Sequence, residues 1–407
     1  MSEETTWPVD TARSIEELLP IEMLEAFRER AGSYDANNVF FGEDFEELKT
    51  SGYLAAPVPQ GLGGAGLGLE QLVTAQRRLA AYAPATALGV NMHLVWVQVA
   101  RFLHDRETGP DGEGPLDWVL SDAVAGEVFA FGISEAGNEA VLMDASSTAE
   151  PEHDGGYLVT GTKIFTTLSP AWTRLGVHAK IVGASESEAR LVFGFVRREG
   201  ADNANLERGS ITHPGVWNPL GMRATQSYTT RLDGVRIAPG DVAAITPPFE
   251  ASDPLMLAIF SSFSILTAAV YAGIADRALE LATEAARRPT LLPDGGEGTR
   301  LDDPDVAARL TEAVLRHRES LDALEILARD VDEPRPRTDW FLALAAARNR
   351  VTDEARSAVD VAMRMVGASA FQADSELARL YRDVLAGLFH PSSSRALAKT
   401  VRGALAD

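Results

Sequence analysis

Two histidines are the first candidates for chemistry in this sequence. His390 lies in the stretch Tyr381 to Arg395 and follows an Arg382-Asp383 pair, while His93 lies in a long uncharged, apolar stretch. Histidine can hold or deliver a proton near neutral pH, so both are candidate catalytic residues. The alternatives are structural: His93 can be a satisfied histidine of a buried helix, and His390 before Pro391 can simply end a helix.

The composition narrows the chemistry and the partners. The chain has 407 residues, no cysteine and seven scattered histidines, so thiolate chemistry, disulfides and cysteine–metal sites are excluded and no metal site is predicted. A formal charge of −22 repels polyanions, and no basic stripe is evident, so no nucleic-acid partner is predicted.

We expect a cytoplasmic protein. The acidic start, Met1 to Glu4, has no apolar segment typical of a secretory signal. Two uncharged stretches, Leu79 to Ala100 and Leu255 to Ala275, have the length of a membrane span. Polar residues interrupt both, so we interpret them as buried core helices and predict no membrane partner.

Periodicity divides the chain into three segments. Up to about residue 127 the pattern is helical, with Ser14 and Glu17 as a capping box and a break near Pro84. From there to about residue 245 it alternates with period two between glycine and proline turns, which predicts antiparallel strands. After Pro254 long helical patterns return, one of them starting at Asp303.

We therefore predict an α+β multidomain fold. An N-terminal helical domain (1–127) precedes a middle antiparallel β-barrel or sandwich (128–245) and a C-terminal four-helix-type bundle (246–407). The run Gly61 to Gly66 fits the G-x-G-x-x-G pattern of dinucleotide sites, but prolines precede it and no acidic residue follows at the required distance. We interpret it as a tight loop.

Several short motifs together resemble the acyl-CoA dehydrogenase superfamily over nearly the whole chain. They are Pro59 to Gly66 (P-x-x-x-G-G-x-G), Phe131 to Gly137 (similar to Y-x-V-T-E-P-G), Gly161 to Thr167 (similar to G-x-K-x-W-I-T), Trp217 to Ser227 (W-x-x-L-G-M-R-x-T-x-S), Arg288 to Thr290 (R-x-T), Gly367 to Phe371 (similar to G-G-x-G-F) and Arg382-Asp383. The resemblance implies a flavoprotein whose subunits form a homotetramer or homodimer.

The resemblance also implies a flavin site. Ser134 and Thr167 would bind the flavin edge, and Phe165 would pack on the ring where tryptophan is usual. The other residues assigned to the cofactor by the motifs are Phe131, Ile133, Thr166, Arg288, Thr290, Gly367 and Ser393. Arg288 would meet the pyrophosphate of a neighbouring subunit's FAD. Pro304 stands near the place of the usual adenine-binding glutamine, which leaves FMN as an alternative.

The resemblance does not extend to the catalytic base. Typical members carry a glutamate where this chain has Pro391, beside His390, and the other known position, within Phe260 to Ile265, has no carboxylate either. Flavin monooxygenases of the superfamily carry histidines near the positions of His390 and His93, close to flavin C4a. Trp96, Phe260 and Phe263 are expected to line an apolar substrate pocket.

Three hypotheses remain open. The first is a dehydrogenase of the acyl-CoA type, acting on an acyl thioester or small apolar molecule, with His390 replacing the glutamate. The second is a monooxygenase that uses reduced flavin and O₂, and the third is a non-catalytic flavoprotein scaffold. A flavin reductase or an electron-transfer flavoprotein is the expected protein partner.

Overall fold

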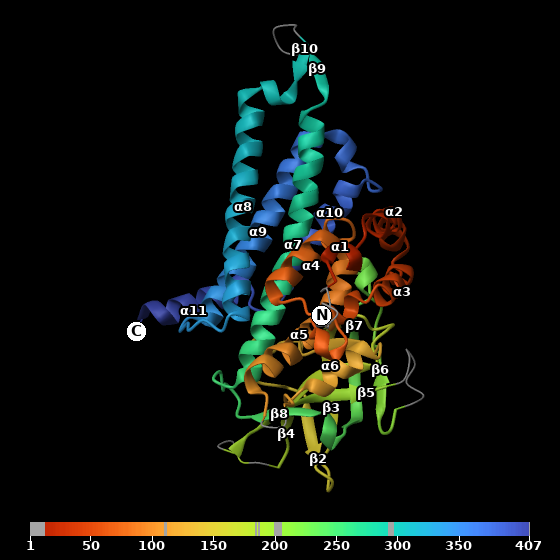
Figure 1. Cartoon of the computed structure of the whole chain (residues 1–407), viewed down its shortest axis with the longest axis vertical. Coiled ribbons are helices and arrows are strands. Elements are labelled where there is room, and N and C mark those ends of the chain that lie inside the picture. Colours follow the sequence, from red (N-terminus) through yellow and green to blue (C-terminus); the bar gives the residue numbers. More distant parts are fainter. Residues whose placement is uncertain are drawn as a thin grey trace, which may run out of the picture.

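Three parts of the chain occupy distinct places in the computed structural model, which describes residues 13–109, 112–183, 185, 188–198, 206–291 and 297–406. Long C-terminal helices stand along the molecule, the N-terminal helices pack against their flank, and the sheet lies at one end (Figure 1). Met1 to Glu4, on which the prediction of no secretory segment rests, lies outside the described residues. The order helical, β, helical is the predicted one.

The N-terminal part consists of helices that follow the local signals in the sequence. They are α1 (Ile15–Leu18), α2 (Ile21–Asn37), α3 (Gly42–Thr50), α4 (Leu69–Ala80), α5 (Pro84–Glu107) and α6 (Asp117–Val124). The predicted capping box is present at α1: Ser14 Oγ accepts from Glu17 N at 3.2 Å, and the Glu17 carboxylate accepts from Ser14 N at 2.7 Å. The glycine run Gly61 to Gly66 is a loop before α4, as predicted.

The middle part is a sheet of short strands. Its strands are β1 (Phe129–Gly132), β2 (Thr148–Pro151), β3 (Tyr157–Thr166), β4 (Arg174–Ile181), β5 (Leu191–Arg197), β6 (Ser210–Thr212), β7 (Tyr228–Ile237) and β8 (Val242–Thr246). The spatial order is β6-β7-β3-β2-β4-β5-β8, and β1 pairs with β4.

Two strand pairs differ from the antiparallel pattern predicted from the sequence. Both β1 and β2 run parallel to β4, with Gly132 opposite Val177 and Thr148 opposite Lys180. Residues 174–177 of β4 pair with β1 and residues 180–181 pair with β2, so β1 and β2 together resemble one strand interrupted by residues 133–147. This segment, called the excursion below, leaves the sheet and returns to it. Period-two alternation predicts strands but not their direction.

The C-terminal part is built from long helices. They are α7 (Pro254–Ala286), α8 (Pro304–Asp332), α9 (Trp340–Val366), α10 (Glu376–Val384) and α11 (Ser394–Ala406), with a hairpin of β9 (Pro289–Leu291) and β10 (Glu297–Thr299) between α7 and α8. The side chain of Asp303 caps α8 by accepting from Asp305 N at 2.9 Å, as predicted. The α9 helix begins after Asp339, whose side chain makes no cap hydrogen bond.

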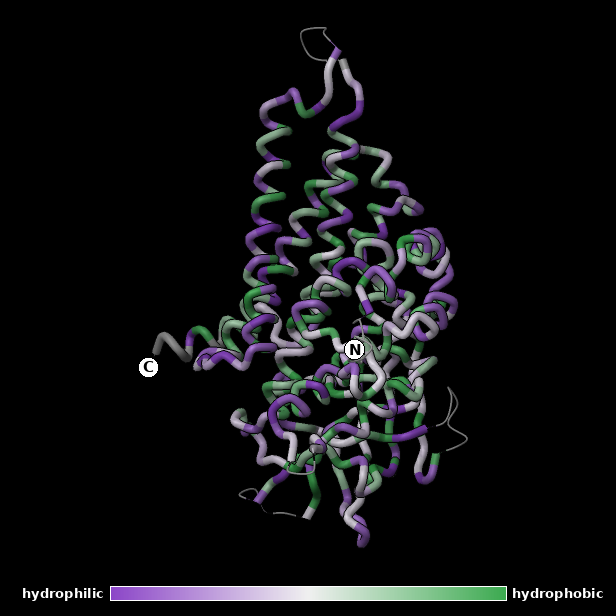
Figure 2. The backbone as a smooth tube through the Cα atoms, in the orientation of Figure 1, coloured by the Kyte–Doolittle hydropathy of each residue, from purple (hydrophilic) through white to green (hydrophobic). Residues whose placement is uncertain are grey.

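Helix α7 is the centre of the bundle. It is long and apolar enough to cross a membrane, yet 89% of its most apolar window is buried inside the protein, as expected of a core helix. Figure 2 shows hydrophobic residues concentrated along α7 and hydrophilic ones interspersed along α8. A Cβ on Gly273 of α7 would lie 2.3 Å from the Arg77 carbonyl of α4, so this glycine allows the N-terminal helices to contact α7 directly.

Candidate functional site

A cavity of about 180 Å³ lies where the three parts meet. Its distinctive feature is a group of hydroxyls, so we call it the hydroxyl pocket. Thr167 Oγ1 lies 2.7 Å from Ser227 Oγ, which lies 2.8 Å from Thr225 Oγ1. The lining residues are Leu88, Met92, Phe131, Ser134, Phe165, Thr167, Trp217, Pro219, Leu220, Gly221, Met222, Thr225, Ser227, Phe263, Arg382, Leu385, Ala386, Phe389, His390 and Pro391.

A second cavity of about 280 Å³, the apolar pocket, adjoins the first. The two share Phe131, Phe263 and Pro391. The rings of Phe131 and Phe263 are stacked, with centroids 5.3 Å apart. The other lining residues are Ile133, Glu139, Ala140, Val141, Leu142, Met143, Ala251, Ile259, Phe260, Phe341, Ala345, Ser392, Ala396 and Leu397.

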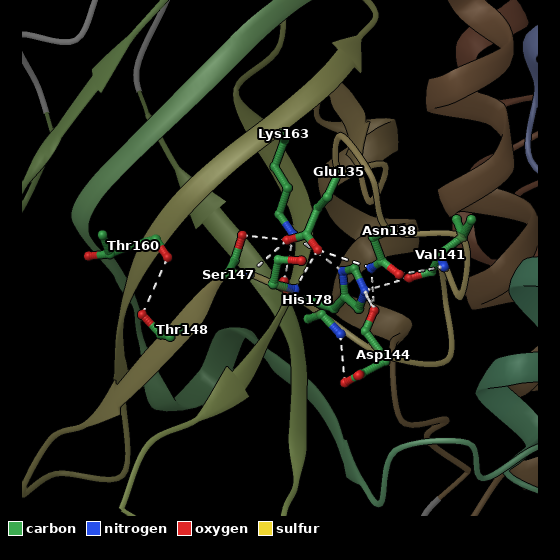
Figure 3. Close-up of polar contacts among 11 residues, drawn as sticks. Glu135, Asn138, Val141, Asp144, Ser147, Thr148, Thr160, Lys163 and His178 are labelled. Carbon is green, nitrogen blue, oxygen red and sulfur yellow. Dashed lines mark hydrogen bonds and ion pairs between the residues drawn. The ribbon is translucent and has the colours of Figure 1, made fainter.

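The excursion supplies a wall of both pockets and is held at its base by a buried ion pair (Figure 3). Lys163 Nζ of β3 donates to Glu135 Oε1 at 2.7 Å and to the His178 carbonyl of β4 at 2.8 Å. The Glu135 carboxylate also accepts from Ser147 N at 2.9 Å and Ser146 N at 2.6 Å, which tie the end of the excursion to its beginning. The side chains of Glu135 and Lys163 are 2% and 0% exposed.

Electrostatics keep this pair charged at neutral pH. Burial alone would raise the pKa of Glu135, but the charge of Lys163 and the hydrogen bonds from Lys163, Ser146 and Ser147 outweigh it and lower that pKa to about 2. Burial lowers the pKa of Lys163, and the Glu135 carboxylate opposes this effect. An ion pair buried this deeply needs every additional hydrogen bond that it makes.

His390 follows the 3₁₀ turn after α10 and contacts α7. Its Nε2 lies 2.6 Å from the hydroxyl of Tyr271, which is fully buried in the middle of α7. Burial raises the pKa of Tyr271, so the phenol keeps its proton and can donate it to Nε2. Burial, together with the nearby charge of Arg348, lowers the pKa of His390 to about 3. The ring is therefore neutral near pH 7, and Nδ1–H is left as its donor.

The segment that carries His390 is clamped from α9. Arg348, which is 1% exposed, donates to the carbonyls of Gly387 and Ser392, and Asn349 Nδ2 donates to the Ser392 carbonyl at 2.8 Å. Ser392 has a positive φ of 60°, unusual for a residue with a side chain. These bonds fix the direction in which the chain leaves the pocket after His390.

Asp383 joins the second half of the sheet domain to α10. Its buried carboxylate accepts from Met222 N at 2.5 Å. A Cβ on Gly221 would lie 2.2 Å from the Arg382 carbonyl, so only glycine permits this approach. The neighbouring Arg382 lines the hydroxyl pocket and forms an ion pair with Asp35 of α2. Arg382 and Asp383 therefore connect α10 to the residues that form the hydroxyl pocket.

The structure brings many of the predicted site residues together. Phe131, Ser134, Phe165, Thr167, Phe263 and His390 line the hydroxyl pocket, while Ile133 and Phe260 line the apolar pocket. Phe165 is 51% exposed and has a positive φ of 56°. A large aromatic face is therefore open toward the pocket.

Other predicted residues lie behind the pockets. Trp96 packs against Phe131 with ring centroids 5.4 Å apart and donates from Nε1 to the Ala130 carbonyl at 3.0 Å, but it lines neither pocket. Thr166 is buried and also absent from both linings. Ser393 lies at the start of α11, where its hydroxyl accepts from Ala396 N at 3.4 Å.

His93, predicted as a candidate catalytic residue, is fully buried in α5. Its Nδ1 accepts from Phe129 N at 3.1 Å, and its Nε2 lies 2.9 Å from the Leu54 carbonyl, to which it can donate. Burial lowers its pKa to about 4. Both ring nitrogens are used between β1 and the turn at Leu54, and His93 lines neither pocket. This geometry fits the alternative of a satisfied core histidine.

Three predicted cofactor residues lie far from the pockets within one subunit. Arg288 precedes β9 and Thr290 lies in it, and this hairpin is at the opposite end of the bundle from the sheet (Figure 1). Gly367 follows α9, whose last turn accepts a hydrogen bond from Arg300 near that same end. The structure does not bring these residues to either pocket.

Sequence reasoning did not assign a role to three residues that shape the site. Thr225 and Ser227 lie within the motif Trp217 to Ser227, so the motif could have indicated that both residues line the hydroxyl pocket. Tyr271 gave no signal, because a tyrosine in an apolar helix is indistinguishable from any other core aromatic.

Comparison with known proteins gives consistent matches. The acyl-CoA dehydrogenase N-terminal domain family matches residues 22–105, and the acyl-CoA dehydrogenase C-terminal domain family matches residues 255–389. The chain is 27% identical to the putative acyl-CoA dehydrogenase YdbM of Bacillus subtilis (strain 168) over 90% of each protein. It is also 27% identical to the dibenzothiophene monooxygenase of Mycolicibacterium goodii, over 76% of this chain and 74% of that protein.

A solved structure agrees with these matches. The structure of KijD3 in complex with FMN and dTDP-3-amino-2,3,6-trideoxy-4-keto-3-methyl-D-glucose has a TM-score of 0.79 to this chain at 25% identity. It covers 98% of this chain, which in turn covers 94% of KijD3. The similarity therefore extends through all three parts of the fold.

Replacing Glu135 with glutamine should test the role of the buried pair. Glu135→Gln leaves the buried Lys163 without its counter-ion, so we expect the free energy of unfolding at pH 7 to fall by about 3–5 kcal/mol. The matched control is Glu150→Gln, which changes an exposed carboxylate on β2 and should leave stability nearly unchanged. Urea unfolding at equilibrium measures both. Equal losses in the two variants would contradict the role of Glu135.

The same pair predicts a dependence on pH. The folded-state pKa of Glu135, about 2, lies below the ordinary value of 4.5, so its stabilisation is complete above pH 4.5 and is lost as the pH falls toward 2. Urea unfolding at several pH values should therefore show a steeper loss of stability over this range for the natural chain than for Glu135→Gln. Parallel curves would contradict this assignment.

Proposed function

The chain belongs to the acyl-CoA dehydrogenase family, and we propose that it is a flavin-dependent monooxygenase of that family, which uses reduced flavin and O₂. The observation that carries the proposal is the missing base. Among the described residues lining the hydroxyl pocket there is no carboxylate, and the one carboxylate of the apolar pocket, Glu139, pairs with Arg395 at 3.7 Å. The similarity to a dibenzothiophene monooxygenase supports the same conclusion.

The residues of the hydroxyl pocket fit a flavin. Phe165 is a half-exposed aromatic face within a cavity, which a flat ring would cover. Thr167, Ser227 and Ser134 offer hydroxyls to a hydrogen-bonding edge, and Phe131 adds an apolar wall. We assign FAD as the cofactor, with FMN as the alternative supported by the FMN complex of KijD3.

A full FAD would need a second subunit. Arg288 and Thr290 lie at the end of the bundle away from the pocket, so they can reach a pyrophosphate only in a neighbouring copy. We therefore propose a homodimer or homotetramer. A separate flavin reductase is the partner expected for an enzyme that starts from reduced flavin.

An ordinary dehydrogenase needs a base at the substrate α-carbon, and His390 is poorly suited to that task. A general base works best when its pKa lies near the working pH. The pKa of His390, about 3, is far below it, because the ring is buried and lies near the charged Arg348. Proton abstraction from a carbon acid by this imidazole would therefore be slow.

The same properties suit His390 for hydrogen-bond donation. A bound reduced flavin supplies the electrons that O₂ requires. Tyr271 donates to Nε2 and thereby holds the neutral ring in one tautomer, with Nδ1–H as the donor. His390 lines the hydroxyl pocket, so this donor can stabilise charge that develops there. The buried Leu88 and Met92 add apolar surface to the same pocket, which limits access of water.

Removing the imidazole should abolish most substrate oxidation. For His390→Ala we expect a loss of about 10²–10³-fold in turnover, the range typical of removing one hydrogen-bond donor that stabilises developing charge. Tyr271→Phe removes one hydroxyl and should lower turnover less, since the imidazole remains. Flavin content and circular dichroism of both variants provide the controls. Unchanged turnover in His390→Ala would contradict its role.

The pH profile offers a separate test. Because the pKa of His390 is lowered to about 3, its ring stays neutral from pH 5 to 8 and should add no inflection to the rate profile in that range. Turnover is measured over this interval for the natural chain and His390→Gln. An inflection near 6.5 that disappears in the variant would show that His390 titrates during catalysis.

Two measurements decide between oxygenation and dehydrogenation. Oxidised, flavin-loaded protein is mixed with butyryl-CoA without oxygen, and reduced protein is mixed with O₂ in a stopped-flow instrument. We expect no anaerobic bleaching, and a return of flavin absorbance in two phases that collapse to one in His390→Ala. Anaerobic bleaching by butyryl-CoA would instead establish a dehydrogenase, and a single phase in the natural chain would argue against the monooxygenase.

A further inference from the structure

Two aspartates from distant parts of the sequence line one small cavity at the junction of α2 and α10. Asp35 of α2 is 9% exposed and Asp383 of α10 is 1% exposed. Tyr34, Arg223 and Arg379 also line this cavity, which has a volume of about 10 Å³. Neither aspartate lines the hydroxyl pocket or the apolar pocket. The two carboxylates therefore form a separate buried site.

Each of the two carboxylates uses only one of its oxygens. Asp35 Oδ2 pairs with Arg382, and Asp383 Oδ1 accepts from Met222 N at 2.5 Å. Asp35 Oδ1 and Asp383 Oδ2 are buried and have no hydrogen-bond partner among the described residues. A buried acceptor without a donor is costly, and two charged acceptors at one cavity are more so. A donor that serves both oxygens would remove this cost.

We propose that this cavity holds one water molecule and one titratable proton, which Asp35 and Asp383 share. A cavity of about 10 Å³ is close to the smallest that admits a single water molecule with polar partners. The proton comes from solvent and forms an O–H bond at Asp383 Oδ2. This O–H donates to the water, the water donates to Asp35 Oδ1, and one of the two negative charges is removed.

The surroundings of Asp383 favour its protonated form in mildly acidic solution. Burial raises the pKa of Asp383 to about 6, and the nearby charge of Asp35 adds to the rise. The charges of Arg379 and Arg382 and the hydrogen bond from Met222 N lower the pKa but do not cancel the rise. Two carboxylates at one buried site thus take up a single proton before either would do so in water.

Other charged and titratable groups face the pair from the neighbouring elements. Arg223 donates to the Asp35 carbonyl at 2.8 Å. Burial raises the pKa of Tyr271 of α7, and the charge of Asp383 adds to this effect. Tyr34 donates to Asp44 at 3.3 Å, and burial raises the pKa of Asp44 to about 6 as well. Variants at Asp383 itself are therefore needed to separate the two carboxyls.

The proton site is connected to the hydroxyl pocket through one turn. Asp383 Oδ1 accepts from Met222 N, and the Met222 carbonyl accepts from Thr225 Oγ1 at 2.8 Å. Thr225 Oγ1 lies 2.8 Å from Ser227 Oγ. A protonated carboxyl is a weaker acceptor than a carboxylate, so uptake of the proton weakens the first bond of this series. The acidity of the solution thereby acts on the packing between the sheet and α10.

Infrared difference spectra of the full chain between pH 7.5 and pH 5 measure the proton directly, because a protonated carboxyl has a carbonyl stretch that a carboxylate lacks. We expect part of this band, with a midpoint near pH 6, to be missing in Asp383→Asn. It should be kept in the matched control Asp374→Asn, which changes an exposed carboxyl in the turn before α10. Equal bands in all three chains would overturn the proposal.

Urea unfolding gives the sign of the effect. The folded-state pKa of Asp383, about 6, lies above the ordinary value of 3.8, so its stabilisation is complete below pH 3.8 and is lost as the pH rises through 6. Relative to Asp383→Asn, the folding equilibrium constant of the natural chain should fall about tenfold or more between pH 4.5 and pH 7.5. A constant ratio would show that Asp383 stays charged, and would overturn the proposal.

Asp35→Asn tests the sharing of the proton and does not require that Asp383→Asn folds. An amide at position 35 no longer repels the Asp383 carboxylate and can donate to it, so the midpoint of the infrared band should move to lower pH. An unchanged midpoint would show that Asp383 binds its proton alone and would refute the shared site. Neither measurement involves substrate or oxygen, so the outcome is independent of the proposed function.

Discussion

The site depends on one buried ion pair between Glu135 and Lys163. The chain leaves the sheet after β1 and returns at β2, and the carboxylate of Glu135 binds backbone amides at the returning end while Lys163 neutralises it from β3. The two buried charges are tolerated because the carboxylate also accepts hydrogen bonds from backbone amides and the ammonium also donates to a backbone carbonyl. Other contacts support the same wall, since His178 Nε2 lies 2.8 Å from the Val141 carbonyl and Phe249 N donates to the Met143 carbonyl at 2.8 Å.

A second constraint acts from the other side of the pockets. Arg348, buried in α9, binds the carbonyls before and after His390, and burial of the ring together with the charge of Arg348 lowers the pKa of His390 and keeps the imidazole neutral. Tyr271 on α7 then selects the tautomer. Position and protonation of His390 are therefore both set by the bundle, whereas the hydroxyls and the exposed face of Phe165 are set by the sheet. The hydroxyl pocket therefore lies between two rigid parts of the fold, and rigid elements hold side chains in fixed orientations.

These constraints explain how a fold of the acyl-CoA dehydrogenase family can keep the shape of the hydroxyl pocket without the glutamate that typical members carry. Pro391 stands where typical members place glutamate, yet the clamp on Ser392 keeps the chain on the same path. In the proposed function the neutral donor His390 stands in place of the charged base, and the adjoining pocket is apolar. Both changes lower the polarity of the space in which the substrate would react, and they favour chemistry that avoids proton abstraction by a carboxylate.

The sequence by itself determined the order of the three parts, the capping of α1 and α8, the family, and six of the residues that line the hydroxyl pocket, because periodicity, caps and motifs are local patterns. Only the tertiary structure decided the partners of the histidines: Tyr271 and His390 are 119 positions apart, and both nitrogens of His93 are used by other segments. It also decided that β1 and β2 run parallel to β4 and that Trp96 lies behind the pocket wall. Spacing along the chain reports which residues share one element, whereas contacts between elements depend on packing that no local pattern contains.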